Sequence, residues 1–266
     1  MRIASKILLD PLTALEIDSS TRCLSLVGAG GKTSLMYALA KNLVHSGKTV
    51  ICTTSTKIYP PDKKQPSKVF LFEDNFPDLE RLAIEIKKAR SCVIGTKIDP
   101  MTGKLIGISN ELIRVLLGLA DHIIIEADGA AGRPIKAPAS YEPVVPDFTD
   151  LAVPVIGLDA VLAEVNGKNV FRLENFLRVT GLKPGDKISP QDIGTLFEHT
   201  DGSLKNIPSG SLVRVFLNKL DMLKDSRIVS ELATEILKTR DGRIRSVVIG
   251  SLQTKEAGYS VFTQLA

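Results

Sequence analysis

Cysteine, histidine and long hydrophobic runs are all scarce in this sequence, and each shortage excludes a class of protein. The three cysteines, Cys23, Cys52 and Cys92, lie far apart and in or beside apolar stretches. Their spacing fits neither a zinc knuckle nor a redox motif, so we expect reduced thiols in the core of a cytoplasmic protein. The three histidines form no cluster with cysteine or acidic residues that has the spacing of metal ligands. The G-x-S-x-G element of serine hydrolases is also absent from the sequence.

The hydrophobic runs and the charge balance exclude two kinds of partner. Runs such as residues 123–125 and 153–158 have the length of a strand and are too short to span a bilayer. The first six residues lack the pattern of an export signal, so we expect no membrane association. The net charge is only +4, and we interpret Lys63, Lys64 and Lys68 as a solvated charge run. Without a cluster of basic residues we expect no nucleic-acid partner.

Short apolar segments alternate with amphipathic helical patterns along the 266 residues. Continuous apolar strands are typical of a parallel sheet that helices cover on both faces, so the pattern predicts an α/β fold. The segment 129–146 contains four prolines and predicts a long ordered loop. The region 159–210 predicts a small helical subdomain, within which Ser189 is placed to cap a helix. We expect strands at 23–27, 49–53, 68–72, 92–95, 122–127, 151–158 and 212–217, a last strand at 246–249, and helices at 32–44, 79–86, 112–117 and 228–237.

The most informative segment is a glycine-rich turn between a strand and a helix, G-A-G-G-K-T-S at 28–34. Glycines let the backbone turn its N–H groups inward, and a helix start adds further donors, which together suit a phosphate group. We expect Lys32 to reach the terminal phosphates and Thr33 to bind Mg²⁺. The spacing G-x-x-G-K-T is shorter than the standard phosphate loop, and this short form also occurs in ATP-using amide ligases. The predicted nucleotide-contacting residues of this loop are Gly28, Ala29, Gly30, Gly31, Lys32, Thr33 and Ser34. The whole chain, 1–266, is thus predicted to be a single P-loop NTPase-like domain.

Two carboxylates, Glu126 and Asp128, follow an apolar strand that ends at this predicted sheet edge. They alternate with Ala127 and so can share one side of the backbone, where with Thr33 they would hold Mg²⁺ beside the nucleotide. We assign catalytic roles to Lys32, Glu126 and Asp128. Arg133 and Lys136 follow in the proline-rich loop and are candidates to bind an anionic substrate, with a solvated basic loop as the alternative.

A second candidate for nucleotide recognition is N-K-L-D at 218–221, directly after an apolar strand. Guanine-nucleotide proteins carry their base-reading element in this position. The Asp221 carboxylate would accept hydrogen bonds from the two guanine donors, which adenine does not offer. Lys219 would lie along the base, and Asn218 would tie loops together. The sequence therefore predicts a nucleotide ligand, GTP or ATP, with guanine favoured by this element.

Taken together, these motifs resemble those of the YqeC-type family, whose members are described as accessory proteins of selenium-dependent hydroxylases. The resemblance implies a cytoplasmic nucleotide-binding protein in the maturation of selenium-dependent molybdenum hydroxylases, with a selenium or molybdenum cofactor or the client hydroxylase as partner. It also draws attention to Thr54, Thr56 and Lys57, which would face the phosphate loop and bind a substrate. The matching segments are 27–34, 53–58, 126–130, 136–138 with 142–146, and 216–221.

Three functions remain open from the sequence. The first is a Mg²⁺-dependent NTPase, using GTP in preference, that assists insertion or activation of the cofactor. The second is an ATP-using phosphoryl-transfer or ligase-type enzyme that acts on a small anionic substrate. The third is a nucleotide-sensing module without turnover.

Overall fold

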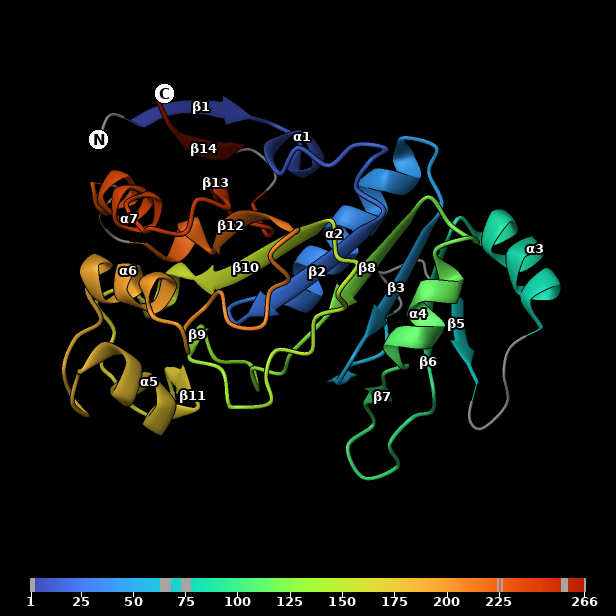
Figure 1. The fold of residues 1–266 in the computed structure, drawn as a ribbon, viewed down its shortest axis with the longest axis horizontal. Coiled ribbons are helices and arrows are strands. Elements are labelled where there is room, and N and C mark those ends of the chain that lie inside the picture. The colour runs from blue at the N-terminus through green and yellow to red at the C-terminus, as the bar shows by residue number, and fades with distance from the viewer. Residues whose placement is uncertain are drawn as a thin grey trace.

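The computed structural model describes residues 3–62, 68–72, 78–223, 225, 227–254 and 258–265. Ten strands form one sheet in the order β1-β14-β13-β12-β10-β2-β8-β3-β6-β5 (Figure 1). Lys63 and Lys64 of the predicted charge run lie outside the described residues. Lys68 is exposed and forms an ion pair with Glu85.

Eight neighbouring strands of this sheet run parallel, as the continuous apolar segments predicted. Every residue of the central strands β2, β8 and β10 except Gly28 is buried, because helices cover both faces. The parallel strands are β2 (Cys23–Gly28), β3 (Val50–Thr54), β5 (Lys68–Leu71), β6 (Ser91–Gly95), β8 (His122–Glu126), β10 (Leu151–Gly157), β12 (Leu212–Asn218) and β13 (Ile244–Ile249).

The expectation that the last strand lies at 246–249 is wrong. Strand β14 (Tyr259–Gln264) follows it and pairs antiparallel with β13, and β1 (Ile3–Leu8) pairs antiparallel with β14. Strand β1 is the outermost strand of the sheet and β14 lies between it and β13, and both are only partly buried. They therefore lack the continuous apolar character by which the central strands are recognised.

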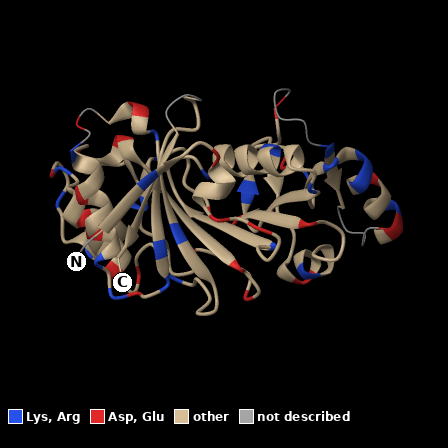
Figure 2. Cartoon of the chain, turned by 90° about the horizontal axis from the view of Figure 1, so that it is seen from above, with Lys and Arg blue, Asp and Glu red and all other residues tan. Residues whose placement is uncertain are grey.

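Helices cover the two faces of the sheet with alternate strand residues beneath them. Leu24 and Leu26 share a core with α1 (Pro11–Ala14) and α2 (Lys32–His45). Cys23 and Val27 belong to the opposite core. That core is completed by α3 (Leu79–Ala89), α4 (Asn110–Leu116), α6 (Pro190–Glu198) and α7 (Ile228–Leu237). Charged residues of both signs lie on the outer helices, while most of the central sheet carries none (Figure 2).

The region between β10 and β12 contains η1 (Leu158–Ala160), β11 (Val170–Phe171), α5 (Leu173–Thr180) and α6. Ser189 caps α6 and forms a capping box with Asp192. Phe176 of α5 and Phe197 of α6 are fully or almost fully buried in the same core as the sheet, so this region packs onto the main body.

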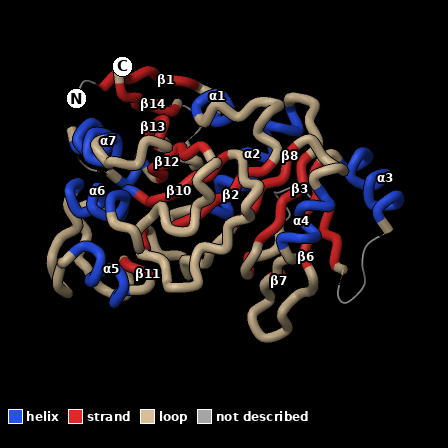
Figure 3. Tube along the Cα trace, in the orientation of Figure 1, coloured by secondary structure: helices blue, strands red, loops and turns tan. Residues whose placement is uncertain are grey.

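Short elements lie near the carboxyl ends of the central strands. In the proline-rich segment, β9 (Ile135–Lys136) pairs with β11, so the predicted loop contains a short ladder. β4 (Lys57–Ile58) pairs with β7 (Leu105–Ile106), and η2 (Leu220–Met222) follows β12. Loops gather around these elements (Figure 3). In the described part of the chain, no helix has both the length and the apolar character that crossing a membrane requires.

Candidate functional site

The glycine-rich turn after β2 packs against β10, and its glycines are required by that contact. Gly28 and Gly30 have φ angles of 89° and 83°, in the region that side chains other than glycine's rarely adopt. A Cβ atom on Gly30 would lie 2.0 Å from the backbone nitrogen of Gly157, and one on Gly28 would lie 2.6 Å from the carbonyl oxygen of Val155. The turn is thus fixed by close backbone approach to the neighbouring strand.

The first N–H groups of this turn bond to protein. The Gly28 N–H donates to Asp128 Oδ2 at 3.0 Å, the Ala29 N–H to the Val155 carbonyl at 2.9 Å, and the Gly30 N–H to the Arg133 carbonyl at 3.0 Å. The first turn of α2 differs, because no side chain caps it among the described residues. Its N–H groups, from Gly31 to Ser34, are therefore the donors available to an anion.

A cavity of about 900 Å³ opens at this end of α2. Its walls combine the helix start, the end of β8, the loop after it, and the segment around β11. It extends well beyond the glycine-rich turn, to Glu142 of the segment 142–146 and to three residues that no sequence motif singled out: Tyr141, Phe171 and Arg172. Of the predicted site residues, it is lined by Gly30, Gly31, Lys32, Thr33, Ser34, Thr56, Lys57, Glu126, Arg133 and Lys219, and not by Gly28, Ala29, Thr54, Asp128, Lys136, Asn218 or Asp221.

Lys32 is buried at the cavity wall, where its charge is met by two carboxylates. Its ammonium lies 3.1 Å from Asp128 Oδ1 and 3.7 Å from Glu126 Oε1, and it donates to the Gly28 carbonyl at 2.6 Å. Burial acts to lower the pKa of this ammonium, but the two carboxylates outweigh burial and raise the pKa. For Glu126, burial dominates and raises the pKa despite the nearby Lys32. The predicted catalytic residues thus meet at one point.

The residues predicted to hold Mg²⁺ offer a fitting set of oxygen atoms. The Thr33 hydroxyl donates to Glu126 Oε2 at 2.7 Å, and both carboxylates lie within 4 Å of the Lys32 ammonium. Oxygen ligands from one or two carboxylates, completed by phosphate oxygens and water, are what Mg²⁺ takes in proteins. No group of three or more histidine, cysteine or acidic side chains that could hold a metal occurs among the described residues. A magnesium ion here would accordingly depend on phosphate oxygens.

Buried ion pairs continue from this point toward the far end of the cavity. Asp128 Oδ2 lies 3.0 Å from the Lys136 ammonium, which lies 2.9 Å from Glu142 Oε2. Glu142 Oε1 in turn lies 3.1 Å from the Arg172 guanidinium. Lys136 is 4% exposed, so it neither projects into solvent nor lines the cavity. We call the series Lys32–Asp128–Lys136–Glu142–Arg172 the ion-pair chain.

Arg133 and the residues after β3 have separate contacts. The Arg133 guanidinium donates to the carbonyls of Ala131 at 2.7 Å and Gly167 at 3.1 Å, which tie it to its own loop and to the segment before β11. Thr54 is fully buried and donates to the Glu126 carbonyl at 2.7 Å, so it positions the end of β8. Lys57 lines the cavity and pairs with Asp99 at 2.7 Å.

The N-K-L-D segment lies beside the phosphate loop, as its position after β12 requires. Asn218 donates to the Gly30 carbonyl at 2.9 Å and accepts from the Leu252 N–H at 3.3 Å, so it ties two loops together. Lys219 lines the cavity and pairs with Asp159 at 2.6 Å. Asp221 is exposed beyond the cavity lining, and its carboxylate accepts from the Ser251 hydroxyl. Asp159, which no motif predicted, keeps one buried oxygen without a partner among the described residues.

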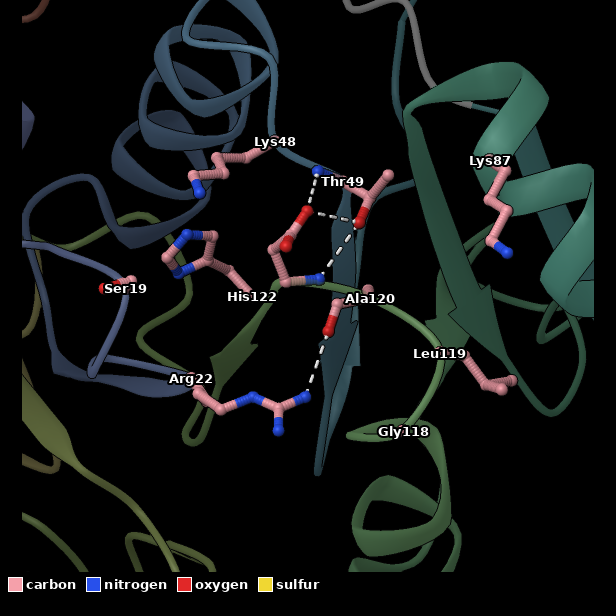
Figure 4. A pocket seen from close by; sticks show the side chains of 10 residues that line it. Ser19, Arg22, Lys48, Thr49, Lys87, Gly118, Leu119, Ala120 and His122 are labelled. Atoms are coloured by element: carbon pink, nitrogen blue, oxygen red, sulfur yellow. Dashed lines mark hydrogen bonds between the residues drawn. The ribbon is translucent and has the colours of Figure 1, made fainter.

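A second, smaller cavity of about 410 Å³ lies at the opposite, amino-terminal edge of the sheet (Figure 4). Its polar groups bond to nearby backbone. Asp121 accepts from the N–H and hydroxyl of Thr49 at 2.7 and 2.8 Å, and Arg22 donates to the Ala120 carbonyl at 3.3 Å. His122 Nδ1 lies 2.7 Å from the Thr21 carbonyl. Because ligands of open α/β sheets bind at the carboxyl ends of the strands, the larger cavity is the candidate site.

Comparison with known proteins places the chain in a family. The family model described as YqeC protein matches residues 24–174, which contain the phosphate loop, the acidic strand end and the ion-pair chain. The chain is 33% identical over 258 residues to the Escherichia coli (strain K12) protein that carries the name "Uncharacterized protein YqeC", covering 95% of this chain and 97% of that protein. No solved structure matches it significantly. The chain therefore belongs to the YqeC family.

Proposed function

We propose that this protein binds a purine nucleoside triphosphate together with Mg²⁺ and hydrolyses it. The observation that carries this proposal is the uncapped first turn of α2, which opens into the large cavity directly beside Lys32 and two carboxylates. A helix start combines free N–H donors with the positive end of the helix dipole, which suits phosphate groups.

The contacts of Lys32 suggest how phosphate and metal would enter together. Its ammonium is held by Asp128 and Glu126, the carboxylates that would hold Mg²⁺. If those carboxylates turned to the metal, Lys32 would become free to pair with phosphate oxygens and to stabilise charge on the transferred group. Thr33 would move its hydroxyl from Glu126 to the metal. Binding of nucleotide and of Mg²⁺ should therefore be strongly coupled.

The surroundings of Asn218 and Asp221 favour guanine over adenine. Asn218 fixes the phosphate loop against the segment after β13, and Ser251 from that segment holds one oxygen of the Asp221 carboxylate. The carboxylate is thereby oriented at the surface beyond Lys219, where a base that extends from the cavity would meet it. A site whose polar groups are paired only by the right base rejects the other base strongly.

The biological setting proposed here comes from the family resemblance. It places the protein in the cytoplasm as an accessory NTPase in the maturation of selenium-dependent molybdenum hydroxylases. Its partner would be the client hydroxylase or a selenium or molybdenum cofactor, and hydrolysis would reset the protein after delivery.

One feature favours the alternative, a phosphoryl-transfer enzyme with a small anionic substrate. The cavity does not end at the phosphate loop but continues to Arg172. That extension gives room for a second molecule beside Arg172. The two functions share the same nucleotide site and differ in what accepts the phosphoryl group, water or a substrate.

The test is to measure melting temperature and phosphate release with GTP and with ATP, each with and without Mg²⁺. We expect GTP with Mg²⁺ to raise the melting temperature most and to be hydrolysed. Equal stabilisation by ATP would remove the guanine assignment and favour the alternative. No stabilisation by either nucleotide would overturn the proposal, whereas binding without turnover would identify a nucleotide-sensing module.

A further inference from the structure

The end of the cavity away from the phosphate loop is built by a ladder between distant parts of the chain. Strand β9 in the proline-rich segment pairs with β11 in the inserted region, in a register that sets Lys136 beside Phe171. The Lys136 ammonium lies 5.3 Å from the centroid of the Phe171 ring. Arg172 follows Phe171, and Tyr141 and Glu142 reach the same place from the proline-rich segment.

Arg172 is held there between two aromatic rings. Its guanidinium carbon lies 4.8 Å from the centroid of the Phe171 ring and 5.5 Å from that of the Tyr141 ring. The guanidinium donates to the Tyr141 hydroxyl at 2.7 Å and to Glu142 at 3.1 Å. Its Nε is buried and has no hydrogen-bond partner among the described residues. The side chain is thus oriented by several contacts while it keeps unused donor capacity.

Arg172 shares its acidic partner with a second cation of the ion-pair chain. Its acidic partner Glu142 also accepts from Lys136 and from the Ala139 N–H. Glu142 is 6% exposed, whereas the Arg172 side chain is 35% exposed and lines the cavity. Burial acts to raise the pKa of Glu142, but hydrogen bonds from Arg172 and Lys136 outweigh it and hold the pKa below its usual value. Of the two cations that Glu142 faces, Arg172 is the one that lines the cavity, where its partly exposed side chain can meet an anionic ligand.

The aromatic side chains beside Arg172 indicate that the ligand contains a planar ring as well as an anionic group. Tyr141 is 65% exposed although it lies in the wall of a cavity, and Phe171 adds a second ring beside it. Aromatic rings offer planar contact area at a small cost in side-chain entropy, and they pair well with other rings.

We propose that Arg172, Tyr141 and Phe171 form a second subsite, which binds an anionic small molecule with a planar ring. This inference deepens the proposed function, because the subsite shares its cavity with the nucleotide. Glu142, Lys136 and Asp128 connect the subsite to Lys32 through buried ion pairs, so they act as positioning residues that link the two ends. Occupation of one end then alters affinity at the other.

The test is calorimetric titration with phenyl phosphate, which combines an oxyanion with a planar ring, and in parallel with inorganic phosphate. The protein is first saturated with a non-hydrolysable GTP analogue and Mg²⁺. We expect one molecule of phenyl phosphate to bind per chain, and Arg172→Gln to weaken it at least tenfold. Arg178→Gln is the matched control, since Arg178 lies on the helix that follows Arg172, pairs with Asp201 and does not line the cavity. Unchanged affinity in Arg172→Gln, or the absence of binding to the parent protein, would overturn the proposal.

A second variant tests the subsite even if Arg172→Gln does not fold. Tyr141→Ala removes an exposed ring together with a hydroxyl that accepts from Arg172, so it should weaken phenyl phosphate severalfold, and more than it weakens inorganic phosphate. Equal weakening of both probes, or of neither, contradicts a ring-binding wall.

Repeating the titration with nucleotide-free Lys32→Ala separates this inference from the proposed function. Binding that depends on Arg172 in that variant supports the subsite even where nucleotide binding itself fails. Loss of phenyl phosphate binding when the GTP analogue is added, by contrast, means that the probe occupies only the phosphate loop and overturns the subsite.

Discussion

The sheet carries charged residues and a cavity at both ends of its central strands, the amino edge and the carboxyl edge, yet the chemistry of the two cavities differs. At the amino edge, Asp121 and Arg22 bond to backbone groups nearby. At the carboxyl edge, charged side chains pair with one another, and the N–H groups at the start of α2 have no capping side chain among the described residues. We therefore expect an anion to bind at the carboxyl edge, where the N–H donors of a helix start are available.

One acid from each edge shows the same contrast in its titration. The N–H and hydroxyl of Thr49 hold the pKa of Asp121 below its usual value, so the folded protein stabilises that carboxylate. Burial raises the pKa of Glu126, so the folded protein disfavours its charge. A carboxylate that its surroundings do not stabilise is available for another cation, and retaining it costs stability.

The largest expected effect is on the free energy of unfolding, which should fall much more when a carboxylate is removed at the carboxyl edge than at the amino edge. Asp128→Asn leaves the buried ammoniums of Lys32 and Lys136 short of a counter-charge, which in buried pairs costs about 3–5 kcal/mol. Asp121→Asn at the amino edge keeps an acceptor for Thr49 and should cost about 1 kcal/mol. Urea unfolding of both variants measures the difference in the free energy of unfolding. Equal losses of stability would mean that the ion-pair chain contributes no more to the free energy of unfolding than a surface contact does.

The next effect concerns phosphate affinity. Lys32→Ala removes the cation at the start of α2 and should weaken nucleotide binding with Mg²⁺ by about 1.5–3 kcal/mol, or roughly tenfold to a hundredfold. Because Lys32 also neutralises Glu126 and Asp128, the melting temperature of the variant must be recorded beside the calorimetry. A folded variant with unchanged affinity would contradict the phosphate-site assignment.

The preference for GTP over ATP tests the role of Asp221 at the carboxyl edge. Asp221→Asn should reduce the preference for GTP over ATP by about tenfold, since an amide cannot accept both guanine hydrogen bonds. Phosphate affinity should persist, because Asn218 and Lys219 keep their own contacts. The measurement is the ratio of GTP to ATP dissociation constants in parent and variant. An unaltered ratio would leave Asp221 as a structural partner of Ser251.

A smaller effect follows from the raised pKa of Glu126. Its folded-state pKa lies above the ordinary value of 4.5, so the folded protein binds more protons in that window and loses stability as pH rises through it. Glu126→Gln removes this loss, which amounts to about 1.4 kcal/mol for each tenfold difference in proton affinity between the folded and unfolded protein. Its stability relative to the parent should therefore increase as the pH rises above about 4.5, while Mg²⁺-dependent nucleotide binding weakens.

The matched control is Glu111, whose pKa is lowered, so its removal should change stability with pH in the opposite direction. Bonds in the first turn of α4 lower the pKa of Glu111, chiefly the bond to its own N–H. This carboxylate therefore adds stability above its ordinary pKa, which Glu111→Gln should lose. Chemical denaturation across pH measures both slopes, and slopes of the same sign would refute the contrast.

The sequence predicts the central sheet and the glycine-rich turn between β2 and α2 well, because both depend on local patterns. Strands buried on both faces are continuous apolar runs, and the glycines of the turn are required by close approach to β10. Strands β1 and β14 were missed, since partial burial leaves a mixed pattern of polar and apolar residues in both.

The far end of the candidate site was missed for a different reason. Arg172 meets Glu142 only through the ladder of β9 and β11, which joins segments far apart in the chain and is two residues long on each side. Lys136, predicted to face an anion, is instead buried, because its ammonium pairs with Asp128 and Glu142 and lies over the Phe171 ring. No periodicity within a short window contains that information.

The smallest expected effect is at the amino edge, where Lys48 and Lys87 line the smaller cavity. Neither lysine faces an uncapped helix start, and this cavity lies at the edge where strands of an open α/β sheet begin. Lys48→Ala and Lys87→Ala should therefore change the GTP dissociation constant less than twofold, at low and at moderate salt. Calorimetry under both conditions distinguishes a local contact from long-range attraction, because salt screens the latter. A loss comparable to that of Lys32→Ala, persisting at moderate salt, would move the nucleotide to the amino edge and reverse the comparison between the two cavities.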